Sequence, residues 1–259
     1  MMTMAQDLLG LICGAMVGFS LGLVGGGGSV LAVPLMVYVV GVPSAHVAIG
    51  TSAVAVAVNA AFNLSAHARS GNVKWACALV FAVAGMAGAF VGTLGGKMLN
   101  GQKLLALFAI LMLVIGALML RSRSRVGTSG VHLNWSNFPA IAGLGLATGM
   151  LSGFFGIGGG FLIVPALMLA TGMPILNAVS SSLVAVTAFG ATTAASYAYS
   201  GLVAWQLAGV FVAGGIIGGL LGVHAARYLA PRRGLLNVVF AAIIICVGIY
   251  MLVHSLALS

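Results

Sequence analysis

The chain has 259 residues, of which 62% are apolar and only 4% are charged. Ordinary soluble domains carry roughly a quarter charged residues, so this composition excludes a water-soluble globule. The formal charge is +9, but the ten lysines and arginines are spread along the chain instead of clustering as a nucleic-acid interface requires. Long stretches without charge lie between Asp7 and Arg69 and between Arg125 and Arg227. They indicate an all-α polytopic membrane protein whose partner is the lipid bilayer, and they speak against a nucleic-acid partner.

Glycine, proline and charged residues divide the chain into ten apolar segments. We expect them at about residues 8–24, 29–41, 44–68, 75–98, 104–120, 138–155, 160–172, 175–199, 203–226 and 234–256. The first segment is expected to be retained, since no basic residue precedes it and no A-x-A cleavage site follows it. Segments 29–41 and 160–172 are too short to cross, because about 13 residues make roughly 20 Å of helix and the hydrocarbon layer is about 30 Å thick. We predict that both are half-helices or re-entrant arms.

The second half of the chain repeats the first at an offset of 131 residues, which becomes 130 after a one-residue gap. Residues 22–34 (GLVGGGGSVLAVP) align with residues 153–165 (GFFGIGGGFLIVP), and residues 70–75 (SGNVKW) align with residues 200–205 (SGLVAW). Internal repeats of this kind build many transporters. We therefore expect three parts, which are a first transmembrane repeat (1–120), a cytoplasmic linker (121–137) and a second transmembrane repeat (138–259).

The distribution of positive charge predicts that the two repeats are inverted. If the first two segments of each repeat form a hairpin, eight of the ten basic residues share one side, and only Lys97 and Lys103 lie on the other. Parallel repeats would divide the same residues five to five. The positive-inside rule favours the uneven division, which places both termini outside the cytoplasm. Whether each hairpin spans the bilayer or re-enters stays open.

Two glycine clusters, residues 25–28 and 156–160, precede the short segments and are the first candidates for a substrate site. Glycine lets the backbone unwind, and the N–H groups at the start of the following half-helix suit an anion. In lipid, such backbone is tolerated only where it lines a cavity or is buried in protein. Close helix packing is the alternative explanation of these glycines. The anion-binding candidates in this part of the chain are Gly27, Gly28, Ser29, Gly159 and Gly160.

Polar residues of the long third segments are the second group of candidates. Hydroxyls that are aligned in the repeat can hydrogen-bond an oxyanion or cap a broken helix, and these residues are Thr51, Ser52, Ser181 and Ser182. Asn59, Asn63 and His67 recur every four residues and so share one helix face. Their repeat counterparts are Phe189, Thr193 and Tyr197. We predict that Asn59 and Asn63 line the substrate route; the alternative is that they only tie helices together.

The sequence predicts no catalytic residue, no metal site and no cofactor. Asp7 is the only acidic residue, so a carboxylate pair for hydrolysis and a buried proton or sodium relay are both excluded. The histidines lack the spacing of metal ligands. Cys13, Cys77 and Cys246 form no C-x-x-C pair and are expected to be buried thiols. We do not expect an enzyme.

Small residues recur every four positions in the fourth segment of each repeat. In the first repeat they are Gly88, Gly92 and Gly96, and in the second they are Gly218, Gly222 and Ala226. Such faces let helix backbones touch. We expect them to pack helices within the chain or to join two chains as a homodimer.

Taken in order, these motifs resemble the sulfite exporter TauE/SafE family of membrane transporters. The resemblance rests on four elements of the first half, most of which the second half repeats, and it covers about residues 8–255. The four are the glycine cluster followed by V-P (25–34), the G-x-P turn (41–43), the A-x-G-T-S run (48–52) and the R-x-G-x-V-x-W turn (69–75). The second half departs from the pattern at Ser180 and at Tyr199, so the identity of the substrate is not carried over.

The resemblance implies a transporter, an exporter or exchanger, in the bacterial cell (inner) membrane. It would move small sulfur-containing anions such as sulfite, thiosulfate or organosulfonates. An inside-negative potential of 100 mV favours the exit of a monoanion by about 2.3 kcal/mol, so export needs no coupled ion. A passive anion channel and a non-transporting membrane scaffold are the alternative functions.

Overall fold

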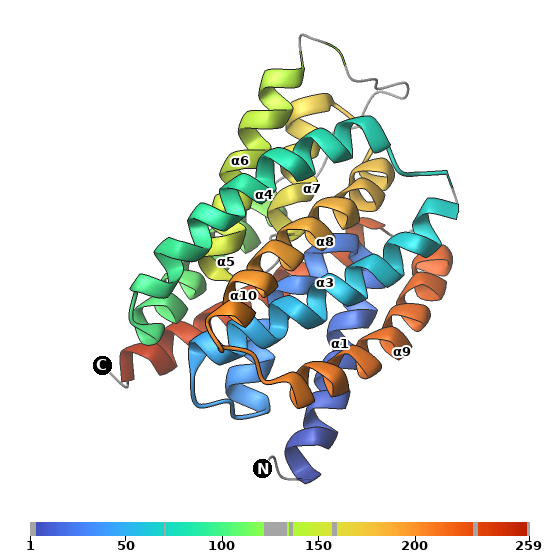
Figure 1. Ribbon diagram of the computed structural model, residues 1–259. Helices are drawn as coiled ribbons and strands as arrows, with labels where there is room; N and C mark the ends of the chain where they lie inside the picture. Colours follow the sequence, from blue (N-terminus) through green and yellow to red (C-terminus); the bar gives the residue numbers. More distant parts are fainter. Residues whose placement is uncertain are drawn as a thin grey trace.

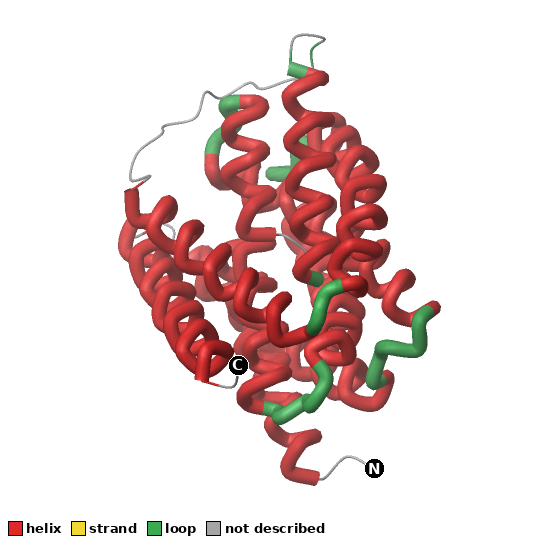
Figure 2. Tube along the Cα trace, turned by 90° about the vertical axis from the view of Figure 1, so that its left-hand side faces the viewer, coloured by secondary structure: helices red, strands yellow, loops and turns green. Residues whose placement is uncertain are grey.

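The computed structural model describes residues 4–69, 71–121, 134, 137–156, 160–229 and 233–257, and every regular element in these ranges is a helix (Figure 2). The elements in chain order are α1 (Met4–Val24), the 3₁₀ helix η1 (Gly25–Leu31), α2 (Ala32–Pro34), the π-helix η2 (Leu35–Val39), α3 (Ala45–Arg69), α4 (Trp75–Met98), α5 (Gly101–Arg121), α6 (Phe138–Phe155), α7 (Gly160–Thr171), α8 (Ile175–Tyr199), α9 (Trp205–Leu229) and α10 (Arg233–Ala257). Within the described residues, six helices are long and apolar enough to cross a membrane: α1, α3, α4, α6, α8 and α9. The prediction of an all-α polytopic membrane protein is confirmed.

The second segment of each half is short, as the sequence predicts. In the first half it is divided among η1, α2 and η2, with Pro34 at the junction of the last two. In the second half it is α7, a helix of 12 residues with Pro165 inside it. Proline has no N–H to donate and disturbs the preceding helical turn. At 1.5 Å per residue α7 is about 18 Å long, which is much less than the hydrocarbon layer.

The turns of the two halves match one another. Six described residues have a positive φ, between +68° and +77°, and all six are glycines, for which this conformation costs little. Each glycine of the first half has a partner one repeat offset later. The pairs are Gly25 with Gly156, Gly41 with Gly172, and Gly71 with Gly201. The sequence repeat is therefore accompanied by a repeat of backbone geometry.

Two pairs of parallel helices, α1 with α9 and α4 with α6, pack backbone against backbone (Figure 1). A Cβ atom built on Gly18 of α1 would overlap the backbone of Gly215 in α9, and one built on Gly92 of α4 would overlap the backbone of Met150 in α6. The small-residue faces predicted from the fourth segments are in these contacts, since Gly88 and Gly218 also meet the neighbouring backbone. These faces thus pack helices within the chain, which is the first of the two expected alternatives, and the homodimer stays a prediction.

Two other pairs, α3 with α8 and α5 with α10, run antiparallel. Gly50, near the start of α3, contacts Tyr197 near the end of α8, and His67, near the end of α3, lies beside Ser180 near the start of α8. Each pair joins equivalent helices of the two halves. A two-fold axis perpendicular to the helices produces such antiparallel self-pairs, and it also exchanges the α1–α9 pair with the α4–α6 pair. These directions agree with the inverted repeat that we predict.

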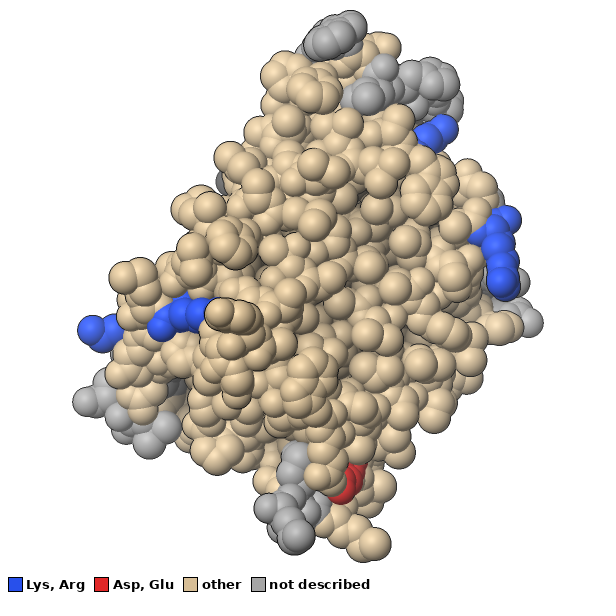
Figure 3. Space-filling view, in the orientation of Figure 1, with Lys and Arg blue, Asp and Glu red and all other residues tan. Residues whose placement is uncertain are grey.

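The described basic side chains lie at two opposite ends of the helices, with an uncharged face between them (Figure 3). Arg69 and Lys74 lie where α3 ends and α4 begins, which we call the inner end. Lys97 and Lys103 lie where α4 ends and α5 begins, which we call the outer end. The other six basic side chains lie outside the described part of the chain, so the eight-to-two division and the cytoplasmic linker stay predictions.

The backbone contact between α1 and α9 predicts a clear difference between two glycines of α9. Gly218→Ala should destabilise the protein by about 1–3 kcal/mol, because the new methyl group overlaps the carbonyl of Ala15. Gly209→Ala is the matched control, since a Cβ there meets nothing within 4 Å and alanine favours the helix. Thermal unfolding in detergent compares the two variants. Equal melting temperatures would contradict the contact.

Candidate substrate site

Two of the predicted hydroxyls accept a hydrogen bond from the backbone N–H group directly before a helix. The hydroxyl of Thr51 in α3 accepts a hydrogen bond of 3.0 Å from the backbone N–H of Ala204, directly before α9. The hydroxyl of Ser181 in α8 accepts a bond of 2.9 Å from the N–H of Lys74, directly before α4. Both residues are buried, and the first N–H groups of a helix have no partner within the helix. The fold thus uses these two hydroxyls as caps, one for each half.

The neighbouring hydroxyls bond to their own helices. Ser52 donates to the carbonyl of Ile49 at 2.9 Å, and Ser182 donates to the carbonyl of Val179 at 2.7 Å. A hydroxyl has one proton to donate. To donate to an anion, each of these serines must first give up its bond within the helix.

The predicted hydroxyls do not meet around one ion. Because α3 and α8 are antiparallel, Ser181 is level with the end of α3 near His67, whereas Thr51 lies near the start of α3. About fifteen residues of helix separate the two levels, which is roughly 22 Å. The structure therefore does not bring Thr51 and Ser52 together with Ser181 and Ser182.

Gly25 and Gly156, the first residues of the two glycine clusters, lie at different levels. Gly25, at the end of α1, packs on Val179 near the inner end, and Gly156, at the end of α6, packs on Ile49 near the outer end. These two glycines differ in level by roughly 28 Å along the α3–α8 pair, whereas the short segments that follow them, η1 and α7, are in contact with one another.

The individual glycine candidates have separate surroundings. A Cβ on Gly28 would meet the backbone of α1 at Ser20 and Leu21, so close packing explains this glycine. Ser29 is fully buried, and Gly160 is buried at the start of α7. Gly27 lies in η1, where its surroundings are outside the described part of the structure, and Gly159 lies outside the described residues.

Asn59 is the polar group with the clearest need of a partner. It lies near the midpoint of α3 and is fully buried, and neither Nδ2 nor Oδ1 has a hydrogen-bond partner among the described residues. Its amide lies against Gly215 of α9, where a Cβ would overlap it. Leaving such a group unpaired in an apolar environment costs roughly 2–7 kcal/mol. Polar groups at this depth in a membrane protein are expensive and usually functional.

A polar stripe continues from Asn59 toward the inner end. Asn63 is buried, donates from Nδ2 to the carbonyl of Asn59 at 3.0 Å, and packs against Gly219. One turn further, Nδ1 of His67 lies 3.3 Å from the hydroxyl of Ser180. Asn59 and Asn63 therefore share a face as predicted, and this face meets the glycines of α9.

The equivalent position in the second half is closed by aromatic rings. Phe189 fills the space over Gly85, and its ring stacks on that of Phe81 with centroids 6.1 Å apart. Gly85 and Gly215 are equivalent in the repeat, so the same glycine position faces a phenyl ring in one half and an amide in the other. The backbone is equivalent in the two halves at this position, but the side chain that faces the glycine differs in polarity.

Three further buried hydroxyls lack a partner among the described residues: Ser152 in α6, and Thr193 and Tyr197 in α8. The sequence predicts no role for these three hydroxyls. Thr193 and Tyr197 are visible in the sequence as the repeat counterparts of Asn63 and His67, whereas nothing in the sequence distinguishes Ser152.

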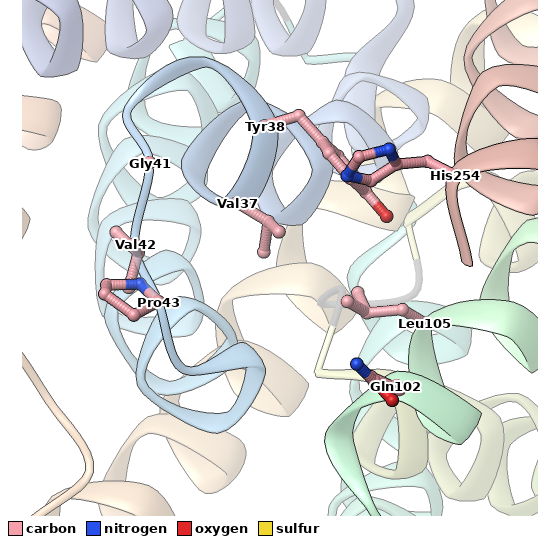
Figure 4. A pocket seen from close by; sticks show the side chains of 8 residues that line it. All are labelled: Val37, Tyr38, Gly41, Val42, Pro43, Gln102, Leu105 and His254. Atoms are coloured by element: carbon pink, nitrogen blue, oxygen red, sulfur yellow. The ribbon is translucent and has the colours of Figure 1, made fainter. Parts of the chain in front are cut away.

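A cavity of about 270 Å³ lies at the outer end, between η2, the turn after it, α5 and α10 (Figure 4). Tyr38 and His254 project into it, and their rings meet edge to face with centroids 5.2 Å apart. Gln102 and Leu105 complete the side formed by α5. None of the predicted site residues lines this cavity, so it is separate from the stripe on α3.

The cysteines differ from the prediction at one position. Cys13 and Cys77 are buried, but Cys246 in α10 is exposed. Within the described residues, no group of three or more His, Cys, Asp or Glu side chains comes together.

Six helices able to span a membrane and two broken short segments are the architecture of a multi-pass membrane protein, and such broken segments occur in transporters. The family model described as "Sulfite exporter TauE/SafE" matches residues 10–251. The chain belongs to this family of membrane transporters.

Relatives with similar names cover nearly the whole chain. A probable membrane transporter protein of Xylella fastidiosa (strain Temecula1) is 50% identical over 99% of this chain and 98% of its own length. The probable membrane transporter protein YunE of Bacillus subtilis is 30% identical over 87% of this chain and 89% of its own length. The probable membrane transporter protein MJ0441 of Methanocaldococcus jannaschii is 27% identical over 93% and 94%. None of the solved structures gives a significant match.

The capping bonds predict that Thr51→Val and Ser181→Ala each destabilise the protein by about 1–3 kcal/mol, since each leaves a buried N–H without its acceptor. Thr51→Ser keeps the hydroxyl and should melt close to wild type. Ser52→Ala should cost less, because it removes only a bond within one helix. Thermal unfolding in detergent ranks the four variants. If Thr51→Val and Thr51→Ser melt together, the capping role is wrong.

Proposed function

We propose that this transporter exports or exchanges small sulfur-containing oxyanions, such as sulfite, thiosulfate or organosulfonates, and that the anion binds beside Asn59 at the middle of the membrane. The observation that carries the proposal is the buried amide of Asn59 without a partner in the described structure. Asn63, on the next turn of the same helix, would line the route toward the inner end.

The chemistry near Asn59 favours an anion over a cation. Nδ2 of an asparagine offers two N–H donors, and an oxyanion offers only acceptors. A buried cation site needs carboxylates or several carbonyl ligands. The only acidic residue of the chain, Asp7, lies at the start of α1 and accepts a bond of 3.2 Å from Gln206. No side chain of the buried helices can therefore supply a negative charge.

The membrane potential supports export as the direction. With 100 mV, inside negative, the exit of a monoanion gains about 2.3 kcal/mol, or roughly a fortyfold gradient. A carrier of this kind needs no proton or sodium relay, which agrees with a core without acidic residues. The family model also bears the name of a sulfite exporter.

A passive anion channel is the second candidate, because a polar stripe can also line a pore. Saturation at high substrate concentration and stimulation by substrate on the opposite side distinguish a carrier from a channel. A scaffold without transport is disfavoured by membership of a transporter family.

The substrate is tested by uptake into proteoliposomes of radiolabelled sulfite, thiosulfate and sulfoacetate, with taurine as a zwitterionic control. The potential is clamped at two values. Saturable movement of one anion that responds to the potential is expected, with roughly a fortyfold shift of the equilibrium gradient per 100 mV for a monoanion. If none of the three anions moves, the proposed substrate class is wrong.

The role of Asn59 is tested by Asn59→Leu, which keeps the size but removes the amide. Transport should fall at least about tenfold, while stability should stay equal or rise, because the unpaired polar group is gone. Val58→Leu, at an exposed position of the same helix, is the control and should transport normally. The assignment would be contradicted if the Asn59→Leu variant transports normally, or if it loses both transport and stability.

A further inference from the structure

Lys97 reaches from the last turn of α4 across to the end of α8. Its Nζ donates to the carbonyl of Ser196 at 2.6 Å, to the hydroxyl of Ser196 at 2.8 Å and to the hydroxyl of Ser200 at 2.8 Å. Nζ also lies 5.0 Å from the centre of the Tyr197 ring. These partners are all neutral. Since Asp7 is the only acidic residue of the chain and pairs with Gln206, no acidic side chain balances this ammonium charge.

Two buried hydroxyls without partners among the described residues lie on the last two turns of α8, the helix that Lys97 contacts. Tyr197 is fully buried, although it carries the largest of the buried side chains, and its hydroxyl has no hydrogen-bond partner among the described residues. The hydroxyl of Thr193, one turn earlier on the same face, is also buried and unpaired there. The ring of His46 stacks on that of Tyr197 with centroids 6.4 Å apart. A buried phenol normally finds a partner, so these hydroxyls point to a ligand.

We propose that Lys97, Tyr197 and Thr193 form a second anion-binding site at the outer end of the transport path. The two hydroxyls donate to the anion, and the ammonium supplies the positive charge. The site takes small oxyanions, the same class as the central site, and its place in transport rests on the proposed function. Tyr197 is level with Gly50 on α3, nine residues from Asn59, so the two sites lie about 14 Å apart along the helix.

The repeat supports a role for the position of Lys97. The sequence alignment of the two halves places Arg227 opposite Lys97, so each half carries a basic residue there. Equivalent positions of an inverted repeat lie toward opposite ends of the membrane. Lys97 is thus the outer member of a duplicated basic position, and it is one of only two basic residues that the inverted topology places on the outer side.

The site is tested with Tyr197→Phe and Lys97→Gln. Tyr197→Phe removes one oxygen and keeps the ring under the ammonium. Tyr199→Phe, whose side chain is 97% exposed, and Lys103→Gln, exposed at the same end, are the matched controls. Titration calorimetry of the purified proteins with thiosulfate, and separately with sulfate, measures affinity and stoichiometry.

We expect two thiosulfate ions per chain for the wild type. Tyr197→Phe and Lys97→Gln should weaken one of the two by about tenfold or more, as expected for a lost hydrogen bond to a charged group, and the controls should bind as the wild type does. Asn59→Leu should lose the other ion. In sided proteoliposomes, the two outer-site variants should raise the half-saturating thiosulfate concentration from the outer side only.

A structural role for Lys97 makes a different prediction. If the role of Lys97 were structural, Lys97→Gln would melt at a lower temperature in buffer without thiosulfate, and Tyr197→Phe would bind thiosulfate with unchanged affinity. Unchanged affinity in Tyr197→Phe, or a wild type that binds neither thiosulfate nor sulfate, would overturn the proposal. The proposed function fails separately, if the wild type moves no sulfur anion while its Tyr197-dependent binding persists.

Discussion

In the hydrocarbon layer a polar group must find its hydrogen-bond partner within the protein, and much of this structure follows from that constraint. Thr51 and Ser181 accept from the N–H groups in front of α9 and α4. Ser52 and Ser182 donate within their own helices. Against this pattern of satisfied hydroxyls, the amide of Asn59 and the hydroxyl of Tyr197 are exceptions. The two proposals rest on this amide and this hydroxyl, because the other hydroxyls named here do have hydrogen-bond partners within the fold.

The two halves have matching backbone geometry, but their side chains at equivalent positions differ in polarity. Glycines with positive φ recur at the repeat offset, and the helix pairs are exchanged by a two-fold relation. At the equivalent of Asn59, however, the second half has Phe189 stacked on Phe81. One half therefore offers a polar stripe toward the inner end, and the other presents rings at mid-depth with hydroxyls and Lys97 beyond them. Such a division gives the path different chemistry on its two sides while keeping one architecture.

The sequence predicts the helices well and the site only in part. Glycine, proline and charge mark the ends of 75–98, 138–155 and 175–199 at the residues where α4, α6 and α8 begin and end. Thr51 and Ser181 are not brought together as the sequence suggests, because equivalent residues of an inverted repeat lie toward opposite ends unless they are close to the axis. Asn59 and Asn63 are found by their four-residue spacing. Their contact with Gly215 and Gly219 depends on the packing of α3 on α9, which no local pattern in either helix contains.

The glycine contacts between α1 and α9 have a mechanical consequence. Backbone meets backbone along both this pair and the α4–α6 pair, so neither helix can slide past its partner without a collision of carbonyl groups. Each pair must move as one rigid body. Since each body joins a helix from one half to a helix from the other, any motion of one pair moves parts of both halves together.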